Sequence, residues 1–355
     1  MAIEHCDNFS IYGGGDFVYN LTNGVYAEYF VPTVNLFLAS DPDGLSSGHV
    51  LSLAGGNNAA YLRYVMSSSQ TTFGQACRIW LTQIPSNSSA IVCIFNVRDT
   101  SNTVIARGQF NTVGGIDIYN SAGTKLGGSS GPVVTANGWW HIESKIVING
   151  ASSSVEVRVE GATVVSLTGI NLGTSPIAQC ALYNNNNGGG TSFTKDLVWW
   201  NGSGSHNTDF LGSVIVAMLS PSADVALNWT PTGGSTGAGI LDNIPPQDGV
   251  QYLTALNPPP AAYVCSLTDL VADVTSVKCI MTMVRAQKTD GGDASLQIGV
   301  ISDPSGTPAT VLGANRPITA AQTYWRDVFE VDPKTSAAWL PSAVNAAELQ
   351  MNRTI

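Results

Sequence analysis

The sequence predicts an all-β protein. Short runs of alternating apolar and polar residues are separated by turns rich in Asn, Gly and Ser, a pattern typical of antiparallel strands. The pattern is clearest between residues 97 and 165, where four to five strands of one sheet are expected at 97–104, 116–123, 139–146 and 154–165. Residues 336–348 contain the only good helical stretch, and it is short.

Strand candidates before and after this region extend the pattern over the whole chain. In the first part they lie at 25–30, 61–66, 77–81, 90–95 and 193–200. Residues 201–206 are small and polar and have linker character. We therefore expect a first domain over 1–202, a linker over 203–207 and a smaller β domain over 208–355. Strands of the second domain are expected at 214–219, 261–267, 277–285, 296–301, 324–331 and 348–353.

Composition limits the partners. Charged residues make up 11% of the 355 residues, against roughly 25% in a typical soluble domain. The net charge is −10 with only 15 Lys and Arg, which disfavours nucleic acid and anionic membranes as partners. No apolar run approaches the ~18 residues of a membrane span, and the N-terminus lacks a signal-peptide pattern. We expect a protein made in the cytoplasm and released, if at all, by lysis.

Two parts of the chain resemble known families. The order of the runs between 97 and 165 resembles the concanavalin A-like, or laminin-G-like, jelly roll. The blocks 207–216, 220–224, 229–231, 242–249 and 331–339 resemble a module that follows such a domain in tailed-phage virion proteins. The resemblance implies a jelly roll whose closing strand lies beside its first strand. It also implies a place on the virion exterior.

The leading expectation from this resemblance is a structural protein on the exterior of a tailed phage, in a fibre, spike, collar or decoration. Its partners would be other virion proteins and copies of itself, with a homotrimer favoured. Host-surface polysaccharide is a candidate ligand. Two alternatives stay open, namely a purely structural module without a ligand and a depolymerase acting on capsule.

No catalytic residue is expected. Related glucanases carry acids at alternating strand positions, E-x-D-x-E, and retaining glycosidases hold two carboxyls ~5–5.5 Å apart. Here Arg158 takes the middle position, and Glu156 and Glu160 are roughly 13 Å apart along a strand. The acids are interpreted as an exposed charge ladder, as are Glu143 and Lys145, so the chain is expected not to be an enzyme. No cofactor or metal site is expected either, because nucleophile, zinc-protease and phosphate-loop motifs are absent.

The candidate glycan-binding residues are Tyr183, Asn184, Asn185, Asn186 and Asn187, which precede three glycines. Amide side chains donate and accept hydrogen bonds with sugar hydroxyls, but a flexible hairpin tip explains the same composition. Asp41 and Asp43 indicate either a plain turn or an oxygen-ligand calcium site.

Two further features have predicted structural roles. One tryptophan of the pair Trp139-Trp140 is expected in the core together with Ile142. Cys77 and Cys93 lie on runs joined by the turn 85–88, so their strands could be neighbours. Reduced core thiols and a disulfide formed after release both stay open.

Overall fold

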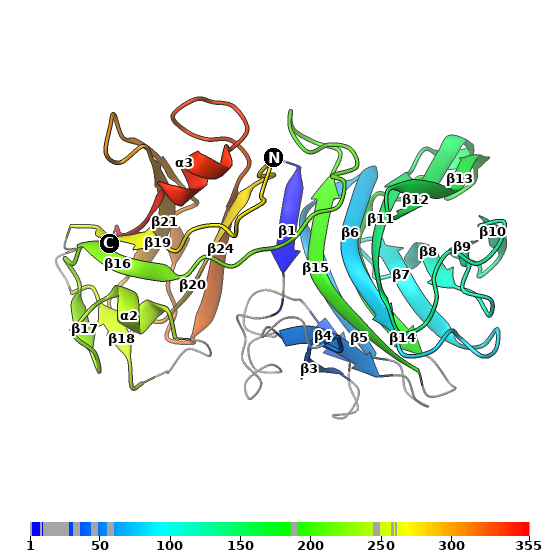
Figure 1. Cartoon of the computed structure of the whole chain (residues 1–355), viewed down its shortest axis with the longest axis horizontal. Coiled ribbons are helices and arrows are strands. Elements are labelled where there is room, and N and C mark those ends of the chain that lie inside the picture. Colours follow the sequence, from blue (N-terminus) through cyan, green and yellow to red (C-terminus); the bar gives the residue numbers. More distant parts are fainter. Residues whose placement is uncertain are drawn as a thin grey trace. The chain divides into compact units, whose positions relative to one another are not determined.

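The computed structural model describes residues 2–7, 9, 28–30, 36–43, 49–54, 60–185, 190–243, 249–256, 259 and 261–354. They form two compact units, of which the first extends to Val216 and the second contains Ala217 onward. Strands are the main regular structure of both units (Figure 1), which confirms the predicted all-β class. The linker expected at 203–207 lies before this division, and the predicted domain boundary stays a prediction.

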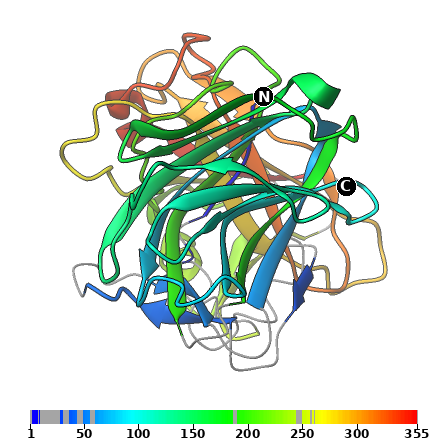
Figure 2. The same ribbon diagram turned by 90° about the vertical axis from the view of Figure 1, so that its right-hand side faces the viewer.

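The first unit is a jelly-roll sandwich of two antiparallel sheets. The eight-stranded sheet runs in the order β13 (Ala162–Ile170), β12 (Ser153–Val159), β11 (Trp139–Val147), β6 (Thr72–Leu81), β15 (Thr191–Asn201), β4 (His49–Ala54) and β3 (Leu36–Ser40), with β1 (Ile3–Asp7) also beside β15. The seven-stranded sheet runs in the order β10 (Lys125–Gly128), β9 (Ile116–Asn120), β8 (Val104–Phe110), β7 (Ile91–Arg98), β14 (Ile177–Asn185), β5 (Ala60–Gln70) and β2 (Glu28–Phe30). Figure 2 shows strands of this unit, coloured cyan to green, running side by side.

The closing strand of the jelly roll lies beside its first strand. Ile3 is opposite Trp200 and Cys6 is opposite Val198 in the β1–β15 ladder. This pairing is the one implied by the jelly-roll resemblance, and it places both ends of the first unit in one sheet.

Residues 97–165 are divided between the two sheets and do not form one sheet as predicted. The run 97–104 contains the end of β7, a turn and the start of β8. Asp99 makes the turn, because its Oδ1 accepts hydrogen bonds from the N–H groups of Ser101 and Thr103, both at 2.9 Å. The run 154–165 is likewise a hairpin, with positive φ at Glu160 (49°) and Gly161 (79°). Alternation alone does not reveal such short turns.

Aromatic residues fill the space between the sheets. Trp199 is fully buried, and its ring stacks on Tyr64 with centroids 5.3 Å apart. Its Nε1–H donates to Gln75 Oε1 at 2.8 Å, so the indole N–H is satisfied inside the core. Ile142 is buried as predicted, whereas Trp139 and Trp140 are both partly exposed, contrary to the expected core tryptophan.

A strap, residues 207–216, crosses the outer face of the eight-stranded sheet. The N–H groups of Leu211 and Gly212 donate to Glu143 Oε1 at 2.7 and 3.0 Å. The N–H of Val216 donates to Asp196 Oδ1 at 2.9 Å. The strand predicted at 214–219 is therefore wrong, because these backbone groups bond to carboxylates and not to a neighbouring strand.

Side chains fix the strap as well. The Arg158 guanidinium lies 3.7 Å from the centroid of the Phe210 ring, and Lys145 Nζ lies 2.9 Å from Asp209 Oδ1. The expectation that Glu143 belongs to an exposed charge ladder is wrong. Glu143 is only 1% exposed, because the strap covers it.

The second unit is smaller and also β-rich. Its six-stranded sheet runs in the order β16 (Pro221–Ala226), β19 (Tyr263–Leu267), β25 (Glu348–Arg353), β21 (Ser295–Ser302) and β22 (Ala309–Leu312), with β23 (Arg316–Pro317) also beside β21. Two pairs complete it, β17 (Thr230–Thr232) with β18 (Tyr252–Thr254) and β20 (Ile280–Ala286) with β24 (Thr323–Phe329). Within the described residues, the helical segments are η3 (Gly150–Ser152), α2 (Ala238–Leu241) and α3 (Pro341–Asn345).

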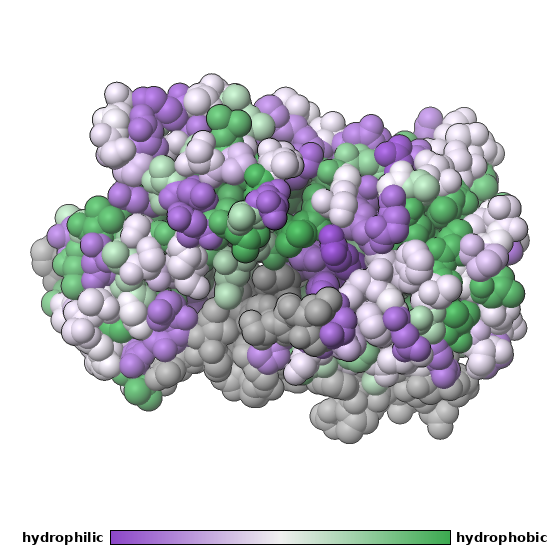
Figure 3. All heavy atoms as spheres, viewed as in Figure 1, coloured by the Kyte–Doolittle hydropathy of each residue, from purple (hydrophilic) through white to green (hydrophobic). Residues whose placement is uncertain are grey.

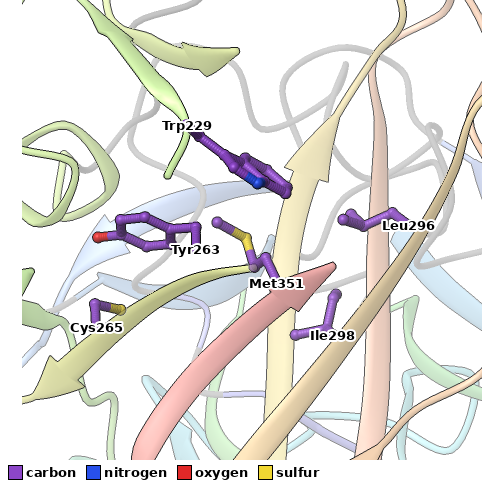
Figure 4. Packing of buried hydrophobic residues seen from close by; sticks show 6 residues of the cluster. All are labelled: Trp229, Tyr263, Cys265, Leu296, Ile298 and Met351. Atoms are coloured by element: carbon purple, nitrogen blue, oxygen red, sulfur yellow. The ribbon is translucent and has the colours of Figure 1, made fainter. Parts of the chain in front are cut away.

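Two apolar clusters hold the second unit together. Figure 4 shows the first, in which Trp229 and Tyr263 pack with Leu296 and Ile298 of β21 and Met351 of β25. The second surrounds Trp339, which is 1% exposed and donates its Nε1–H to the carbonyl of Phe329 at 3.0 Å. The unit therefore has a core of its own.

Candidate functional site

The candidate site lies on the outer face of the seven-stranded sheet. Along β5, Leu62 and Tyr64 point into the core and are buried, while Tyr61, Arg63 and Val65 alternate with them and are partly or fully exposed. Period-two alternation therefore places the polar residues of this strand on the solvent side.

A row of side chains crosses this face perpendicular to the strands. Tyr61 on β5 is opposite Tyr183 on β14, and Tyr183 is opposite Cys93 on β7. Cys93 is opposite Gln109 on β8, which in turn is opposite Asp117 on β9. Five strands thus contribute one residue each to a continuous row.

Arginines flank this row. Arg107 is opposite Tyr119, and its guanidinium carbon lies 5.1 Å from the centroid of the Tyr119 ring. On the neighbouring pair of strands, Arg98 of β7 is opposite Gln179 of β14. We call the whole set the arginine–tyrosine face: Tyr61, Arg63, Arg98, Gln109, Arg107, Tyr119, Gln179 and Tyr183.

The face carries positive charge without matching carboxylates. Arg98 donates from Nε to Asn96 Oδ1 at 3.2 Å and from Nη1 to the Asn102 carbonyl at 3.1 Å, both neutral acceptors. Within the described parts of the chain, neither Arg98 nor Arg107 has an ion pair. Asp117 is paired with Lys125 at 2.9 Å, so the acid at the end of the row is already neutralised.

Two polar atoms at the centre of the face are buried without a hydrogen-bond partner. They are Arg107 Nε and Gln109 Oε1, on two residues of β8 that share the same face. Buried polar groups are nearly always hydrogen-bonded in folded proteins. A donor and an acceptor left open side by side indicate a place for a ligand with oxygen acceptors and hydroxyl donors.

Tyr183 is a neutral phenol at this site. Burial raises its pKa above the ordinary value of 10.0, and the nearby Cys93 acts in the same direction. A hydrogen bond with Asn185 and the charges of Arg107 and Arg98 oppose this rise without cancelling it. The phenol therefore keeps its proton at neutral pH and can donate a hydrogen bond.

The structure separates the predicted glycan-binding residues. Tyr183 and Asn185 belong to the arginine–tyrosine face or its border. Asn184 points the other way and is fully buried, with Nδ2 donating to the Leu53 carbonyl at 2.8 Å and to Ser192 Oγ at 3.0 Å. Asn184 thus links the end of β14 to β4 and β15 inside the core. Asn186 and Asn187 lie outside the described residues.

Sequence reasoning missed the arginines and glutamines of the face. Their signal was present, because Tyr61 and Arg63, Arg107 and Gln109, and Asn96 and Arg98 each occupy alternate positions of a strand. Three short polar pairs far apart in sequence gave no reason to group them. Only the strand order β9-β8-β7-β14-β5 brings them together.

The other acids considered from the sequence are paired within the protein. Glu156 Oε1 accepts from Arg158 Nε at 2.8 Å, and Glu160 Oε1 accepts from the His141 N–H at 2.6 Å. Asp41 is buried and lies 2.6 Å from Lys195 Nζ, so its turn is tied to the sheet by an ion pair.

The described residues offer neither a metal site nor a membrane-spanning helix. They contain no group of three His, Cys, Asp or Glu side chains placed to hold a metal ion. They also contain no helix of the length and hydropathy needed to cross a bilayer.

The chain is similar to known proteins in structure but not in sequence. No protein-family model matches the chain, and no curated protein matches it. One similar structure is the alginate lyase Aly36B, at 13% identity and a TM-score of 0.39, covering 57% of this chain and 98% of that one. A second is an endo-β-1,4-glucuronan lyase from the fungus Trichoderma reesei, at 8% identity and a TM-score of 0.40, covering 50% and 93%. A third is the carbohydrate-binding module CBM66 from Bacillus subtilis, at 11% identity and a TM-score of 0.34, covering 50% and 97%.

These findings correct two expectations. The similar structures named here are two polysaccharide lyases and a carbohydrate-binding module, and none is a virion protein. The comparisons therefore contradict the leading expectation of a structural protein on a phage exterior, and they likewise contradict the expectation that the chain is not an enzyme. At these identities the likeness says nothing about this chain's own ligand, which has to be argued from its residues. The homo-oligomer and the phage-type character of the second unit stay predictions.

Proposed function

We propose that the first unit binds an acidic polysaccharide across the arginine–tyrosine face. The observation that carries this proposal is the pair of buried atoms Arg107 Nε and Gln109 Oε1, which have no hydrogen-bond partner among the described residues. A sugar carboxylate would accept from Arg107, and a sugar hydroxyl would donate to Gln109.

The chemistry of the face suits a uronic acid. A guanidinium presents a planar fork of donors that matches a carboxylate, and such charge-assisted hydrogen bonds are the stronger kind. The rings of Tyr61, Tyr119 and Tyr183 offer apolar surface together with a hydroxyl. In a chain with a net charge of −10, the neighbourhood of Arg98 and Arg107 is also the place where an anion is least repelled.

The size of the face favours a polymer over a single sugar. The row from Tyr61 to Asp117 crosses five strands. Adjacent strands are about 4.8 Å apart, so the row is roughly 19 Å long. A stretch of several sugar units would contact every residue of it.

A second candidate function is cleavage of the same polysaccharide. Tyr183 is a neutral phenol, and Arg107 and Arg98 are close enough to influence its pKa. In an elimination, water would take the C5 proton of the uronate and the C4–O bond would break as the C4–C5 double bond forms. The Tyr183 phenol would give its proton to the departing oxygen while an arginine holds the adjacent carboxylate. Binding without cleavage needs no such proton donor.

The test uses the full chain, a polyuronate such as alginate, and a neutral glucan of similar length. Wild type is expected to bind the polyuronate with an affinity that falls as salt rises, because exposed charges are screened. Arg107→Gln is expected to weaken binding about tenfold or more, since a hydrogen bond to a charged group is worth roughly 1.5–3 kcal/mol. Arg158→Gln, on the other sheet, is the matched control and should bind like wild type.

The same mixtures decide between the two candidates. Cleavage by elimination would generate an ultraviolet-absorbing double bond, and Tyr183→Phe should abolish that signal while binding persists. Binding with no absorbance change identifies a binding protein. Equal affinity of wild type and Arg107→Gln for the polyuronate would refute the proposed site.

A further inference from the structure

The outer face of the opposite, eight-stranded sheet carries a row of aromatic side chains. Trp139 on β11 is opposite Trp80 on β6, and Trp80 is opposite Phe193 on β15. All three are partly exposed. Because adjacent strands are about 4.8 Å apart, the row offers roughly 10 Å of aromatic surface.

A polar row lies directly beside the aromatic row on the same face. His141 is opposite Arg78, and Arg78 is opposite Lys195, each two positions along its strand from the aromatic row. Figure 3, in the view of Figure 1, shows hydrophilic side chains gathered over the middle of β15 and β6. The strap contacts the sheet from this row onward, at Arg78 through Ser213 and at Glu143 beyond it. It therefore leaves the aromatic row uncovered.

Two nitrogens of the polar row are buried without a hydrogen bond. His141 is 2% exposed, and its Nε2 has no partner. Arg78 Nε lies 3.5 Å from Asp196 Oδ2 as an ion pair but makes no hydrogen bond. Open polar atoms of this kind require a partner that the protein itself does not provide.

The charges of this face are already matched. Lys195 Nζ lies 2.6 Å from Asp41 Oδ2, and Arg78 is paired with Asp196. Burial and the nearby Arg78 charge lower the pKa of His141 below 6.5, so its imidazole is neutral at neutral pH. An anion would have no free cation to bind here, in contrast to the arginine–tyrosine face.

We infer that the row Trp139–Trp80–Phe193, with His141 and Arg78 beside it, is a second carbohydrate site that takes a neutral, hydroxyl-rich sugar. Trp80 and Phe193 supply the stacking surface, because Lys195 Nζ already lies 4.2 Å from the Trp139 ring centroid and occupies that ring. Sugar hydroxyls fill the hydrogen bonds left open at His141 Nε2 and Arg78 Nε. The chain would then hold an acidic and a neutral glycan on opposite faces of one sandwich.

The experiment measures binding of a neutral oligoglucan and of a polyuronate by the full chain, using calorimetry and tryptophan fluorescence. Trp80→Leu is expected to weaken binding of the neutral glycan at least tenfold and to leave polyuronate binding unchanged. Trp140→Leu is the matched control, because Trp140 is next to the row in sequence but is opposite Ile79 on the other face. Thermal unfolding verifies that each variant folds, and Phe193→Leu replaces Trp80→Leu if that variant does not.

Failure of this site and failure of the proposed polyuronate site give different results. The inference is overturned if wild type binds no neutral glycan, or if Trp80→Leu and Phe193→Leu bind it as tightly as wild type. Loss of neutral binding in Arg107→Gln with no loss in Trp80→Leu would place that sugar on the arginine–tyrosine face and would also overturn it. Loss of polyuronate binding in Arg107→Gln alone concerns only the other site.

Discussion

The carboxylate of Glu143 accepts a hydrogen bond from the backbone N–H of Leu211 at 2.7 Å, although the two residues are 68 positions apart in the chain. Glu143 is 1% exposed and lies on β11, in the middle of the eight-stranded sheet. A buried acid thus holds the segment that immediately precedes the second unit, and this relationship leads to the first prediction.

Glu143→Leu is expected to destabilise the first unit. The substitution keeps the volume of the side chain but leaves the N–H groups of Leu211 and Gly212 without their acceptor, at a cost of about 1–3 kcal/mol. Urea unfolding measures the loss, and hydrogen exchange locates it in the strap. Glu156→Leu, on the half-exposed part of β12, is the control with a small expected effect. Unchanged exchange at residues 211 and 212 would show that Glu143 does not hold the strap.

Asp196→Asn is expected to preserve or raise stability at neutral pH. Burial raises the pKa of Asp196 above 3.8, so the folded state disfavours the ionised form. The folded state then binds the proton more tightly than the unfolded state, and stability rises as pH falls through the folded pKa toward 3.8. Asparagine removes this dependence, retains an acceptor for the Val216 N–H and tolerates the φ of 53° at this position.

Asp196→Ala separates charge from conformation. It also removes the ionisable group, but it lacks the acceptor and is strained at positive φ, so it should be clearly less stable than Asp196→Asn. Unfolding curves of wild type and both variants, at neutral and mildly acid pH, provide the comparison. Equal stability of the two variants would mean that the hydrogen bond and the backbone conformation contribute nothing.

The core thiols are expected to resist alkylation. Burial raises the pKa of Cys77 and of Cys93 to about 12, which leaves very little thiolate at neutral pH. Cys279 is only half-buried and should react first. Mass spectrometry after iodoacetamide treatment of the native protein tests this order. A linked Cys77–Cys93 peptide would contradict the structure, because β6 and β7 belong to different sheets and both residues are free thiols.

Gly74→Ala is expected to disturb the first unit strongly. A Cβ atom at this position would lie 1.9 Å from Cε2 of Trp200, a fully buried ring. Overpacking of this kind typically costs about 1–3 kcal/mol. Gly131→Ala is the control, since a Cβ there meets no atom within 4 Å. Thermal unfolding of both variants gives the comparison, and equal midpoints would show that Trp200 can move aside.

The all-β class followed from the sequence because it depends on local signals, whereas the jelly roll was implied by the resemblance to the concanavalin A-like family. Alternation of side chains along a strand is a property of the backbone itself, so the strands around Tyr61, Cys77 and Glu348 were found close to their observed positions. For Cys77 and Cys93 the sequence left two states open, reduced thiols and a disulfide, and the structure has reduced thiols. The short turns at Asp99 and Glu160 were not predicted, because their residues continue the alternating pattern.

The two candidate faces were decided by tertiary structure alone. Tyr183 is more than 70 positions in sequence from Arg107 and Gln109, and it shares a face with them only because β8, β7 and β14 are neighbours in the sheet. Glu143 likewise looked like one more surface charge, since a strand pattern cannot show that a distant segment will cover it. Local alternation determined which residues leave the core, whereas strand order and the path of the strap determined which of them meet, because only long-range packing brings distant residues together.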